Sequence, residues 1–381
     1  MNIIGIVCEY NPFHNGHKYQ IEKIKEKYND SLIIVCTSSS FTQRGNLSIQ
    51  TKFEKTASAL LNGVDIVIEL PYVYSTQSSD IFASYAIKIL NEFKIDTLCF
   101  GSESNDINMI INNAKIQLFN KDFDSKVKLY MDEGINYPTA LNNALISLNG
   151  TSINEANDLL ALSYVKEVLK SKYKINFYPI KRTNDYHDIK LDSDIVSSTN
   201  IREKLNNKTN IDKYIPENTI KYLNYVDYND KYFELLKYKI INENDLSIYL
   251  DVDEGLSTRI VKAIKKSKNL EELINNIKTK RYTYNKINRM LNHILCSYTK
   301  EEKETTKKLE YVRILGFSNN GQKYLNQIKS KIKTPILNKY DTSTYKGLAI
   351  EKRISQIYSI IYKNIMDDEI KNKPIKKDEL N

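Results

Sequence analysis

Two histidines bracket an Asn-Gly pair in the segment HNGH (14–17), which directly follows a short apolar run at residues 2–8. An apolar run, a turn and a helical pattern predict a strand that ends where a helix begins. The first turn of a helix offers unpaired backbone N–H groups and the positive end of the helix dipole, so it binds anions. His14 and His17 are therefore placed to donate hydrogen bonds to phosphate oxygens, and Gly16 lets the backbone approach a ligand closely.

Two other interpretations of this segment are open. Histidines three residues apart can bind a metal ion, but no third ligand of the expected type is nearby, so a metal site is disfavoured. The two histidines can also be polar caps of a helix that binds nothing. A strand, a turn and a helix start suit phosphate better than either.

A second polar turn occurs about 180 residues later, in VSSTNIREKL (196–205). Ser197, Ser198 and Thr199 supply hydroxyl groups and helix-start N–H groups, and Arg202 lies one turn further along the predicted helix. Because serine and threonine cap most helices, this turn is informative only together with the histidine segment.

The elements that must position these residues alternate between strands and helices. Apolar runs predict strands at 2–8, 31–37, 64–70, 95–103 and 175–181, and helical patterns lie between them at 14–28, 51–63 and 78–93. Such alternation predicts an α/β fold, a Rossmann-like parallel sheet covered by helices on both faces. In this fold, ligands bind at the carboxyl ends of the strands, where the histidine segment begins.

The chain changes character near residue 205. Helical patterns dominate afterwards, as at 243–267 and 270–281, with one short strand expected around 311–317. A length of 381 residues suits two domains, and we place them at 1–205 and 206–381, the second mostly α-helical. The polar tail at 371–381 is expected to be frayed.

Charge also divides the chain. Residues 1–200 contain 20 Lys and Arg against 23 Asp and Glu, a net charge of −3, whereas residues 201–381 contain 36 against 24, a net charge of +12. Most of the excess lies in 251–350, with 21 basic and 10 acidic residues. A general lysine bias would enrich both halves, so the asymmetry favours a polyanionic partner for the second half.

Composition excludes several classes of protein. No apolar run approaches the ~20 residues that a membrane span needs, and the apolar start of the chain has no basic leader of the kind that signal peptides carry. The four cysteines show no CxxC spacing, which argues against a metal cage or a disulfide framework. We therefore expect a cytoplasmic protein that has no resident metal and does not contact membranes.

The histidine segment followed by SSTNIR resembles the nucleotidylyltransferase superfamily with the HIGH-type signature. Within it, the chain resembles the tRNA-Met cytidine acetate ligase family through EYNPFHNGH (9–17), SSSFTQRGN (38–46), GVDIVIELPYVYSTQS (63–78), FGSES (100–104) and NDLLALSYVK (157–166). The likeness covers residues 1–205 in order. The second half matches only in length and in its helical, basic character.

The resemblance implies an enzyme that activates acetate with ATP to acetyl-adenylate. The acetyl group then passes to the wobble cytidine of elongator tRNA-Met, giving N4-acetylcytidine. Mg²⁺ would be carried by ATP, and His14, His17 and Arg202 would be the catalytic residues. The implied ATP contacts are a first loop of Val7, Cys8, Glu9, Tyr10, Asn11, Pro12, Phe13, His14, Asn15, Gly16, His17, Lys18, Tyr19 and Gln20, adenosine contacts at Gly101, Asn157 and Arg182, and the turn of Ser197, Ser198 and Thr199.

Two departures from the family pattern are visible. The family usually has Ser-Pro-Asn before the helix that contains Asn157, whereas this chain has NEAND, so Asn157 rests on the match of the helix alone. The late turn more often has Ser-Ala where this chain has Ser197 and Ser198, a conservative change.

Basic residues of the candidate tRNA surface come from two places. Arg44 lies in the loop after the second strand, at the same edge of the sheet as the histidines. The others are Lys262, Lys265 and Lys266, with Lys278, Lys280 and Arg281 as a second cluster. Two alternatives remain open: an adenylyltransferase acting on a phosphorylated cofactor precursor, which would not need the large basic half, and an RNA-binding protein with a vestigial nucleotide fold, which would not need intact motifs.

Overall fold

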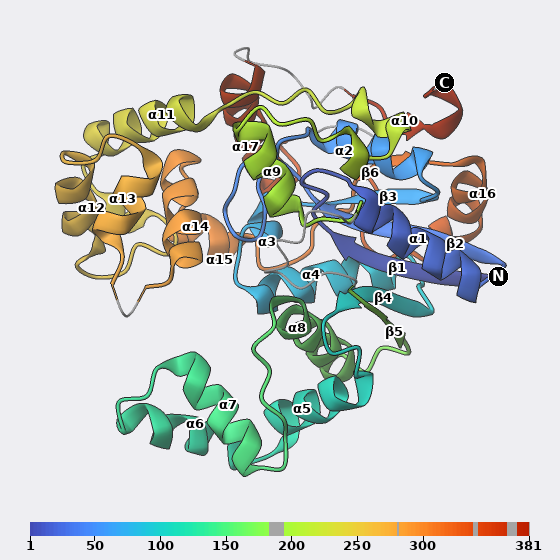
Figure 1. Cartoon of the computed structure of the whole chain (residues 1–381), viewed down its shortest axis with the longest axis horizontal. Helices are drawn as coiled ribbons and strands as arrows, with labels where there is room; N and C mark the ends of the chain where they lie inside the picture. Colours follow the sequence, from blue (N-terminus) through green and yellow to red (C-terminus); the bar gives the residue numbers. More distant parts are fainter. Residues whose placement is uncertain (183–193, 280–281, 338–341, 364–371, 381) are drawn as a thin grey trace.

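A seven-stranded sheet forms the centre of the molecule (Figure 1). The computed structural model describes residues 1–182, 194–279, 282–337, 342–363 and 372–380. The strand order is β5-β4-β1-β2-β3-β6-β7, and β1 to β5 run parallel to one another. The strands are β1 (Asn2–Cys8), β2 (Ser31–Ser38), β3 (Ile66–Leu70), β4 (Thr97–Ser102), β5 (Asn176–Lys181), β6 (Ile314–Phe317) and β7 (Ile375–Lys376). The predicted Rossmann-like parallel sheet is confirmed.

Helices cover both faces of the sheet because alternate side chains of each buried strand point to opposite faces. In β2, Ile33 and Val35 join the cluster that contains Ile21 of α1 and Leu60 of α2. Ile34 and its even-numbered neighbours join the larger cluster on the other face, together with α4 and α8. The helices that follow the first strands are α1 (Asn15–Lys27), α2 (Lys52–Leu61), α3 (Tyr72–Ser75), α4 (Ser79–Glu92) and α8 (Ala156–Lys170).

Two groups of helices extend away from the sheet (Figure 1). The first, between β4 and α8, contains α5 (Ile107–Phe119), α6 (Phe123–Asp132) and α7 (Tyr137–Ser147). After β5 come α9 (Ser198–Asn206) and α10 (Glu217–Ile220), with a 3-10 turn at Asp212–Tyr214 between them. The second group, the helical lobe, contains α11 (Asn229–Asn242), α12 (Leu256–Ile264), α13 (Leu270–Ile277), α14 (Tyr284–Leu295) and α15 (Lys300–Thr305).

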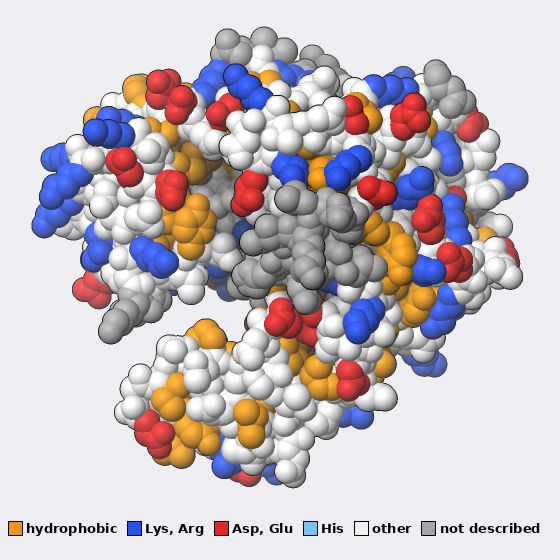
Figure 2. All heavy atoms as spheres, in the orientation of Figure 1, with side chains coloured by type: hydrophobic (Ala, Val, Ile, Leu, Met, Phe, Trp, Pro, Cys, Tyr) orange, Lys and Arg blue, Asp and Glu red, His pale blue; other side chains and the backbone are white. Residues whose placement is uncertain are grey.

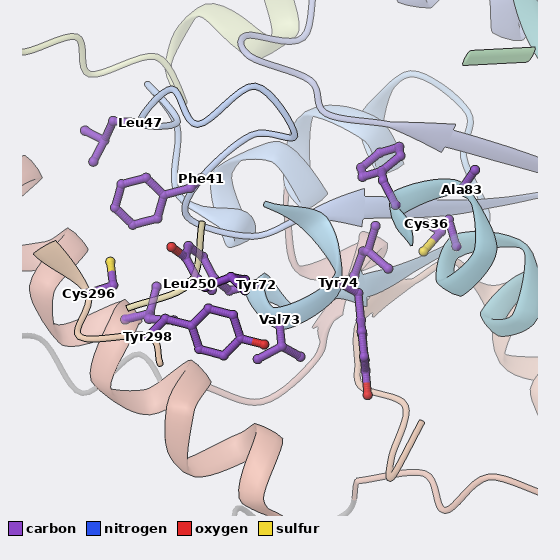
Figure 3. Packing of buried hydrophobic residues seen from close by; sticks show 14 of the residues in the cluster. Cys36, Phe41, Leu47, Tyr72, Val73, Tyr74, Ala83, Leu250, Cys296 and Tyr298 are labelled. Carbon is purple, nitrogen blue, oxygen red and sulfur yellow. The ribbon is translucent and has the colours of Figure 1, made fainter. Parts of the chain in front are cut away.

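The helical lobe shares a hydrophobic core with the sheet region. Phe41, in the loop after β2, packs edge-on against Tyr72 of α3, which in turn packs against Tyr298 of the lobe. Figure 3 shows these rings together with Cys296 and Leu250, and all five side chains belong to one buried cluster. A continuous core of this kind fixes the lobe relative to the sheet.

The chain returns from the lobe to the sheet before it ends. β6 pairs antiparallel with β3, β7 pairs parallel with β6, and α16 (Asn319–Ile328) lies beside them. The short strand expected around 311–317 is therefore confirmed. The prediction of a frayed tail is wrong for the described residues, because Ile375–Lys376 extends the sheet and Lys221 donates to the carbonyl of Leu380 (3.3 Å). The boundary predicted at residue 205 thus marks a change in the character of the sequence, but residues after it also form part of the sheet.

A buried ionic cluster fastens this returning segment to the first half. Lys52 of α2 pairs with Glu69 of β3 and with Glu351 of α17 (Lys346–Lys363), the latter at 3.0 Å. Arg313 pairs with Glu69 at 3.5 Å, and Glu351 also accepts from the backbone N–H of Tyr72 (2.8 Å). Removing one partner of a buried pair typically costs about 3–5 kcal/mol, because it leaves the other charge uncompensated.

Among the described residues, no helix is both long enough and apolar enough to serve as a membrane span.

Candidate active site

A cavity of about 860 Å³ opens at the carboxyl ends of β1, β4 and β5. This edge lies where the strand order reverses on either side of β1, the position at which doubly wound sheets bind ligands. The start of α9, the loop after β2 and one side of α14 complete the wall. The volume falls within the roughly 300–1,000 Å³ range of small-molecule sites.

Most of the predicted ATP-site residues line this cavity. They are Val7, Cys8, Glu9, Tyr10, Asn11, His14, Gly16, His17, Tyr19, Gln20, Gly101, Asn157, Arg182, Ser197, Ser198, Thr199 and Arg202. Four predicted residues do not line it. Pro12 and Phe13 are buried behind it, Lys18 is exposed, and the side chain of Asn15 donates to backbone carbonyls of Asp194 and Lys213 (3.0 and 2.8 Å).

The two histidines form a reciprocal cap at the start of α1. Nδ1 of His14 accepts from the N–H of Gly16 (3.0 Å), and Nδ1 of His17 accepts from the N–H of His14 (3.2 Å). The two rings stack with their centroids 3.8 Å apart. A Cβ atom on Gly16 would lie 2.8 Å from the His14 ring, so only glycine fits between the two histidines.

Both histidines are neutral at pH 7. Burial, together with the charges of Arg182 and Arg202, lowers the pKa of His14 from 6.5 to about 3. Burial and the adjacent His14 ring lower the pKa of His17 well below 6.5. Because each Nδ1 accepts a backbone hydrogen bond, the ring proton resides on Nε2. Each histidine therefore has one N–H donor available to a ligand in the cavity.

Arg202 joins the two sequence motifs, which lie about 180 residues apart. Its guanidinium donates to the carbonyl of Asn11 in the first motif (2.6 Å) and to the hydroxyl of Thr199 in the second (3.1 Å). Ser197 caps α9 by accepting from the N–H of Asn200 (3.2 Å). The starts of α1 and α9 thus meet at one cavity, and each helix contributes its N-terminal end.

The opposite side of the cavity is formed by β4, β5 and the start of α8. Gly101 lies near the end of β4, and a Cβ atom there would only contact Arg182 at 3.5 Å, an ordinary separation. The surrounding protein therefore does not require glycine at this position. What glycine provides is open space on the cavity side.

Two carboxylates hold the loop after β4 against α8. Asp158 accepts from the backbone N–H groups of Glu103 and Ser104 (3.2 and 3.0 Å), and Glu103 accepts from the N–H of Asp158 (3.1 Å) and from the side chain of Asn157. Asn157, a predicted adenosine contact, is therefore held at the loop after β4 by hydrogen bonds that the sequence analysis did not foresee.

Cys8 also lines the cavity. Burial raises its pKa to about 12, and hydrogen bonds with Thr37 and Tyr10 offset only part of that rise. At neutral pH the group is a thiol, whereas acyl transfer through cysteine needs the thiolate.

Comparison with known proteins assigns the chain to a family. The HIGH Nucleotidyl Transferase family model matches residues 1–373. A tRNA(Met) cytidine acetate ligase from Geobacillus sp. (strain WCH70) is 36% identical over 98% of this chain and 100% of its own length. One from Clostridium novyi (strain NT) is 38% identical, with 98% and 99% covered. The chain belongs to the tRNA(Met) cytidine acetate ligase family.

Solved structures agree with this membership of the ligase family. The crystal structure of Thermotoga maritima TmcAL bound with alpha-thio ATP matches with a TM-score of 0.85 at 26% identity, covering 99% of both chains. The apo form of the same protein matches with a TM-score of 0.87, covering 98% of this chain and 97% of that one.

The basic residues predicted for the ligase's RNA surface lie at different places. Arg44 lines the main cavity. Lys262 and Lys266 line a separate groove of about 410 Å³ on α12 and α13, together with Arg259, which the sequence analysis missed. Exposed Lys265 and Lys278 do not line that groove. Two further candidates, Lys280 and Arg281, lie outside the described residues.

The sequence analysis missed the part of the cavity that the second half supplies. These residues are Tyr225, Tyr228, Asn229, Tyr284, Asn285 and Arg289. A signal was present: asparagines are poor helix formers, yet α14 has them at 285, 288 and 292, in addition to Arg289. Spacings of three and four residues place such side chains on adjoining faces of a helix, and this pattern indicates a polar contact surface.

Proposed function

We propose that this protein activates acetate with ATP to acetyl-adenylate and transfers the acetyl group to the wobble cytidine of elongator tRNA-Met. The observation that carries the proposal is the pair of neutral histidine donors at the start of α1, joined through Arg202 to the start of α9. Together they form a phosphate-binding arrangement in a cavity large enough for ATP and a second substrate.

The first step is attack by a carboxylate oxygen of acetate on the α-phosphorus of ATP. A bond forms between that oxygen and phosphorus, the bond from the α-phosphorus to the bridging oxygen breaks, and pyrophosphate leaves with the electron pair. No proton has to move, because acetate is ionised at pH 7. Catalysis then depends on positioning and on stabilising charge on the phosphate oxygens.

His14 and His17 suit this role because they are neutral donors. A neutral imidazole N–H donates a hydrogen bond to a phosphate oxygen without transferring its proton. The backbone hydrogen bond accepted by Nδ1 fixes the position of each ring. Arg202 and the two helix N-termini add positive potential. Gly101, Asn157 and Arg182 would contact the adenosine side of ATP.

The second step is attack by the exocyclic amine of cytidine on the acetyl carbon. A carbon–nitrogen bond forms, the bond from the acetyl carbon to the phosphate oxygen breaks, AMP leaves, and the amine releases one proton. A wobble base suits such a site because an anticodon loop is single-stranded and its bases can be splayed outward. Because burial raises the pKa of the Cys8 thiol to about 12, we expect the acetyl group to pass directly from adenylate to amine and not through this cysteine.

Mg²⁺ would reach the site on ATP. Among the described residues, no group of three or more His, Cys, Asp or Glu side chains is arranged to hold a metal ion. Magnesium usually keeps several waters and binds through substrate phosphates, so such a cage is not required. When bound, the ion supplies neutralisation of phosphate charge. We place the reaction in the cytoplasm.

We place a tRNA contact at the α12–α13 groove. Arg259, Lys262 and Lys266 line one hollow, and Lys and Arg side chains gather at this end of the molecule in Figure 2. The net charge of +12 in residues 201–381 acts in the same direction. Phosphates of an RNA backbone are the polyanion that this charge and geometry fit.

Exchange of labelled pyrophosphate into ATP tests the first step. We expect exchange to require acetate and to proceed without tRNA, because the phosphate-binding residues and the cavity are complete in the protein alone. Longer carboxylates and phosphorylated amines or alcohols serve as matched alternatives. Exchange that requires a phosphorylated precursor instead of acetate would establish a small-molecule adenylyltransferase and overturn the proposal.

A further inference from the structure

One part of the cavity wall, the α14 end, comes from the helical lobe and from the segment just before α11. The residues that form it are Tyr225, Tyr228, Asn229, Tyr284, Asn285 and Arg289. Their chemistry differs from that of the phosphate end, which is the part of the cavity formed by the starts of α1 and α9 with His14, His17 and Arg202. The α14 end has aromatic rings, amides and one guanidinium in place of helix starts and histidines. Aromatic rings with a planar donor group are typical of sites that bind single-stranded bases.

Helix α14 reaches this end through two polar faces. Asn285 and Arg289, one turn apart, line the cavity, whereas Asn288 and Asn292, also one turn apart, hold the loop at 42–46. The first pair is thus directed to a ligand space, and the second pair is occupied by protein. The face with Asn288 and Asn292 therefore fixes the helix, while the face with Asn285 and Arg289 is left to contact a ligand.

The contact between this loop and α14 is close. The side chain of Asn288 donates to the carbonyl of Arg44 (3.1 Å), and that of Asn292 donates to the carbonyl of Gly45. Gly45 has a φ of +85°, and a Cβ atom there would lie 2.7 Å from the backbone nitrogen of Arg289. The backbone of Arg289 is consequently held against the loop at 42–46, which also lines the cavity next to the phosphate end.

Arg289 has unused donors. Its Nε is buried and has no hydrogen-bond partner among the described residues, and no described carboxylate forms an ion pair with the guanidinium within 4.0 Å. Asp251, which interacts with Arg289 electrostatically, is paired with His293 at 3.6 Å. Arg289 is half-buried and lines the cavity, and a buried donor such as its Nε is costly unless a ligand accepts from it.

Cytosine matches these donors. Its O2 and N3 are adjacent acceptors, and a guanidinium can donate to both at once, whereas uracil has an N–H donor at position 3 and would leave one contact unmade. The reactive amine is the next group along the same edge, so it stays free to face the adenylate. Tyr284, 42% exposed at the rim, offers a ring face for stacking.

We propose that the α14 end of the cavity is the subsite for the acceptor cytosine, in which Arg289 donates to O2 and N3 and Tyr284 stacks on the ring. This inference rests on the proposed function and adds the recognition of the base to it. It makes Arg289 a specificity-determining residue of the second step, with no part in the first.

The test compares three variants of the full chain: Arg289→Ala, Arg289→Lys and, as a control for loss of one positive charge on the same helix, Lys286→Ala. Lys286 pairs with Asp253 at 2.8 Å and does not line the cavity. Acetate-dependent pyrophosphate exchange reports the first step. Single-turnover acetyl transfer to the tRNA reports the second, and binding of the unmodified tRNA against the same tRNA with uridine at the wobble position reports base recognition.

We expect exchange to stay within about twofold in all three variants, since the inference assigns Arg289 to the base and not to ATP. Transfer should fall about 10–100-fold in Arg289→Ala, and preference for cytidine over uridine should be lost, as for the removal of a bidentate base contact. Arg289→Lys keeps the charge but not the planar pair of donors, so it should lose the preference too. Lys286→Ala should keep both transfer and preference.

Several outcomes would overturn the inference while leaving the proposed function intact. Unchanged transfer and preference in Arg289→Ala would show that Arg289 does not contact the base. Equal weakening for cytidine and uridine tRNA, rescued by Arg289→Lys, would make Arg289 a phosphate contact. Loss of exchange in a folded variant would place it in the ATP site. Failure of the wild-type protein itself to transfer acetyl would instead refute the proposed function.

Discussion

The phosphate end and the α14 end of the cavity are built in different ways. The phosphate end uses two helix starts and two neutral histidines, each positioned by bonds to its own local backbone. The α14 end uses side chains from segments far apart in sequence, positioned by packing and by the loop at 42–46. The first arrangement suits charge stabilisation at a fixed point, and the second suits recognition of a ring and its edge.

A single loop connects the two ends. Ile49 donates its N–H to the side chain of Asn11 at the phosphate end (2.8 Å), and Gln50 accepts from the N–H of Phe13 (3.2 Å). The same loop, at 42–46, is held by Asn288 of α14. The distance between the two ends is therefore set by short polar contacts. A reaction that transfers a group between two bound substrates needs such a fixed distance.

The largest expected effect is at the phosphate end, in His17. His17→Asn keeps an acceptor near the position of Nδ1 and removes the donor at Nε2, whereas His17→Gln does the reverse. Removing one donor to a developing oxyanion typically costs about 10²–10³-fold in rate. We expect His17→Asn to lose acetate-dependent pyrophosphate exchange by that factor and His17→Gln to retain more of it.

The result that would contradict this prediction is the opposite order. If His17→Asn exchanges normally and His17→Gln does not, His17 acts by capping α1 and not by donating to phosphate. Thermal unfolding of both variants controls for stability, since loss of a helix cap costs about 0.5–2 kcal/mol.

A smaller effect is expected at the contact between the two ends. Asn292→Ala leaves the carbonyl of Gly45 and the hydroxyl of Tyr232 without their partner, and an unsatisfied buried group costs about 1–3 kcal/mol. We expect denaturant unfolding to show that loss, and acetyl transfer to fall more than exchange. Asn242→Ala, an exposed asparagine on α11, is the matched control. Equal losses of transfer and exchange would show that the loop does not separate the two ends.

Substitutions in the α12–α13 groove are expected to have a weaker effect, to which several basic residues contribute. Replacing Arg259, Lys262 and Lys266 together by Glu should lower tRNA affinity roughly tenfold or more at low salt and flatten the salt dependence, since each neutralised phosphate contributes about −0.7 to −0.9 to the log–log slope. Lys265→Glu, exposed but outside the groove, should change affinity much less. Similar losses in the two variants would mean that net charge, and not the groove, attracts RNA.

The smallest expected effect concerns pH. The folded protein holds His14 neutral with a pKa of about 3, whereas an unfolded chain titrates near 6.5, so below pH 6.5 the unfolded state binds more protons. The contribution of His14 to the free energy of unfolding is therefore fully present above pH 6.5 and is lost as the pH falls toward 3. Free energies of unfolding at pH 7.5 and 5 should differ more for wild type than for His14→Asn. An equal difference would show that His14 is not held neutral.

The phosphate end could be predicted because its geometry is local. A strand, a turn and a helix start within fifteen residues place His14, Gly16 and His17 without any knowledge of the rest of the chain. The strands of the sheet could be found for the same reason, because buried parallel strands are continuous apolar runs. The roles of Ser197 and Arg202 could be predicted only because the histidine motif occurs earlier in the same chain.

The α14 end could not be predicted because its residues gain their role only from packing. Arg289 looks like any helical arginine until Gly45, 244 residues earlier, is placed against its backbone. The strand at Ile375–Lys376 was missed for a similar reason: a single apolar residue followed by a lysine acquires strand structure only by pairing with β6. Contacts at this separation leave no periodic pattern in the sequence.

The buried cluster of Lys52, Glu69, Arg313 and Glu351 has a consequence for biosynthesis. A ribosome releases Lys52 and Glu69 long before Arg313 and Glu351, so the nascent Lys52–Glu69 pair lacks its two other buried partners until the end of synthesis. Until then the edge of β3 is also unpaired, and open strand edges invite association with other chains. Fragments that stop near residue 205 are therefore expected to aggregate.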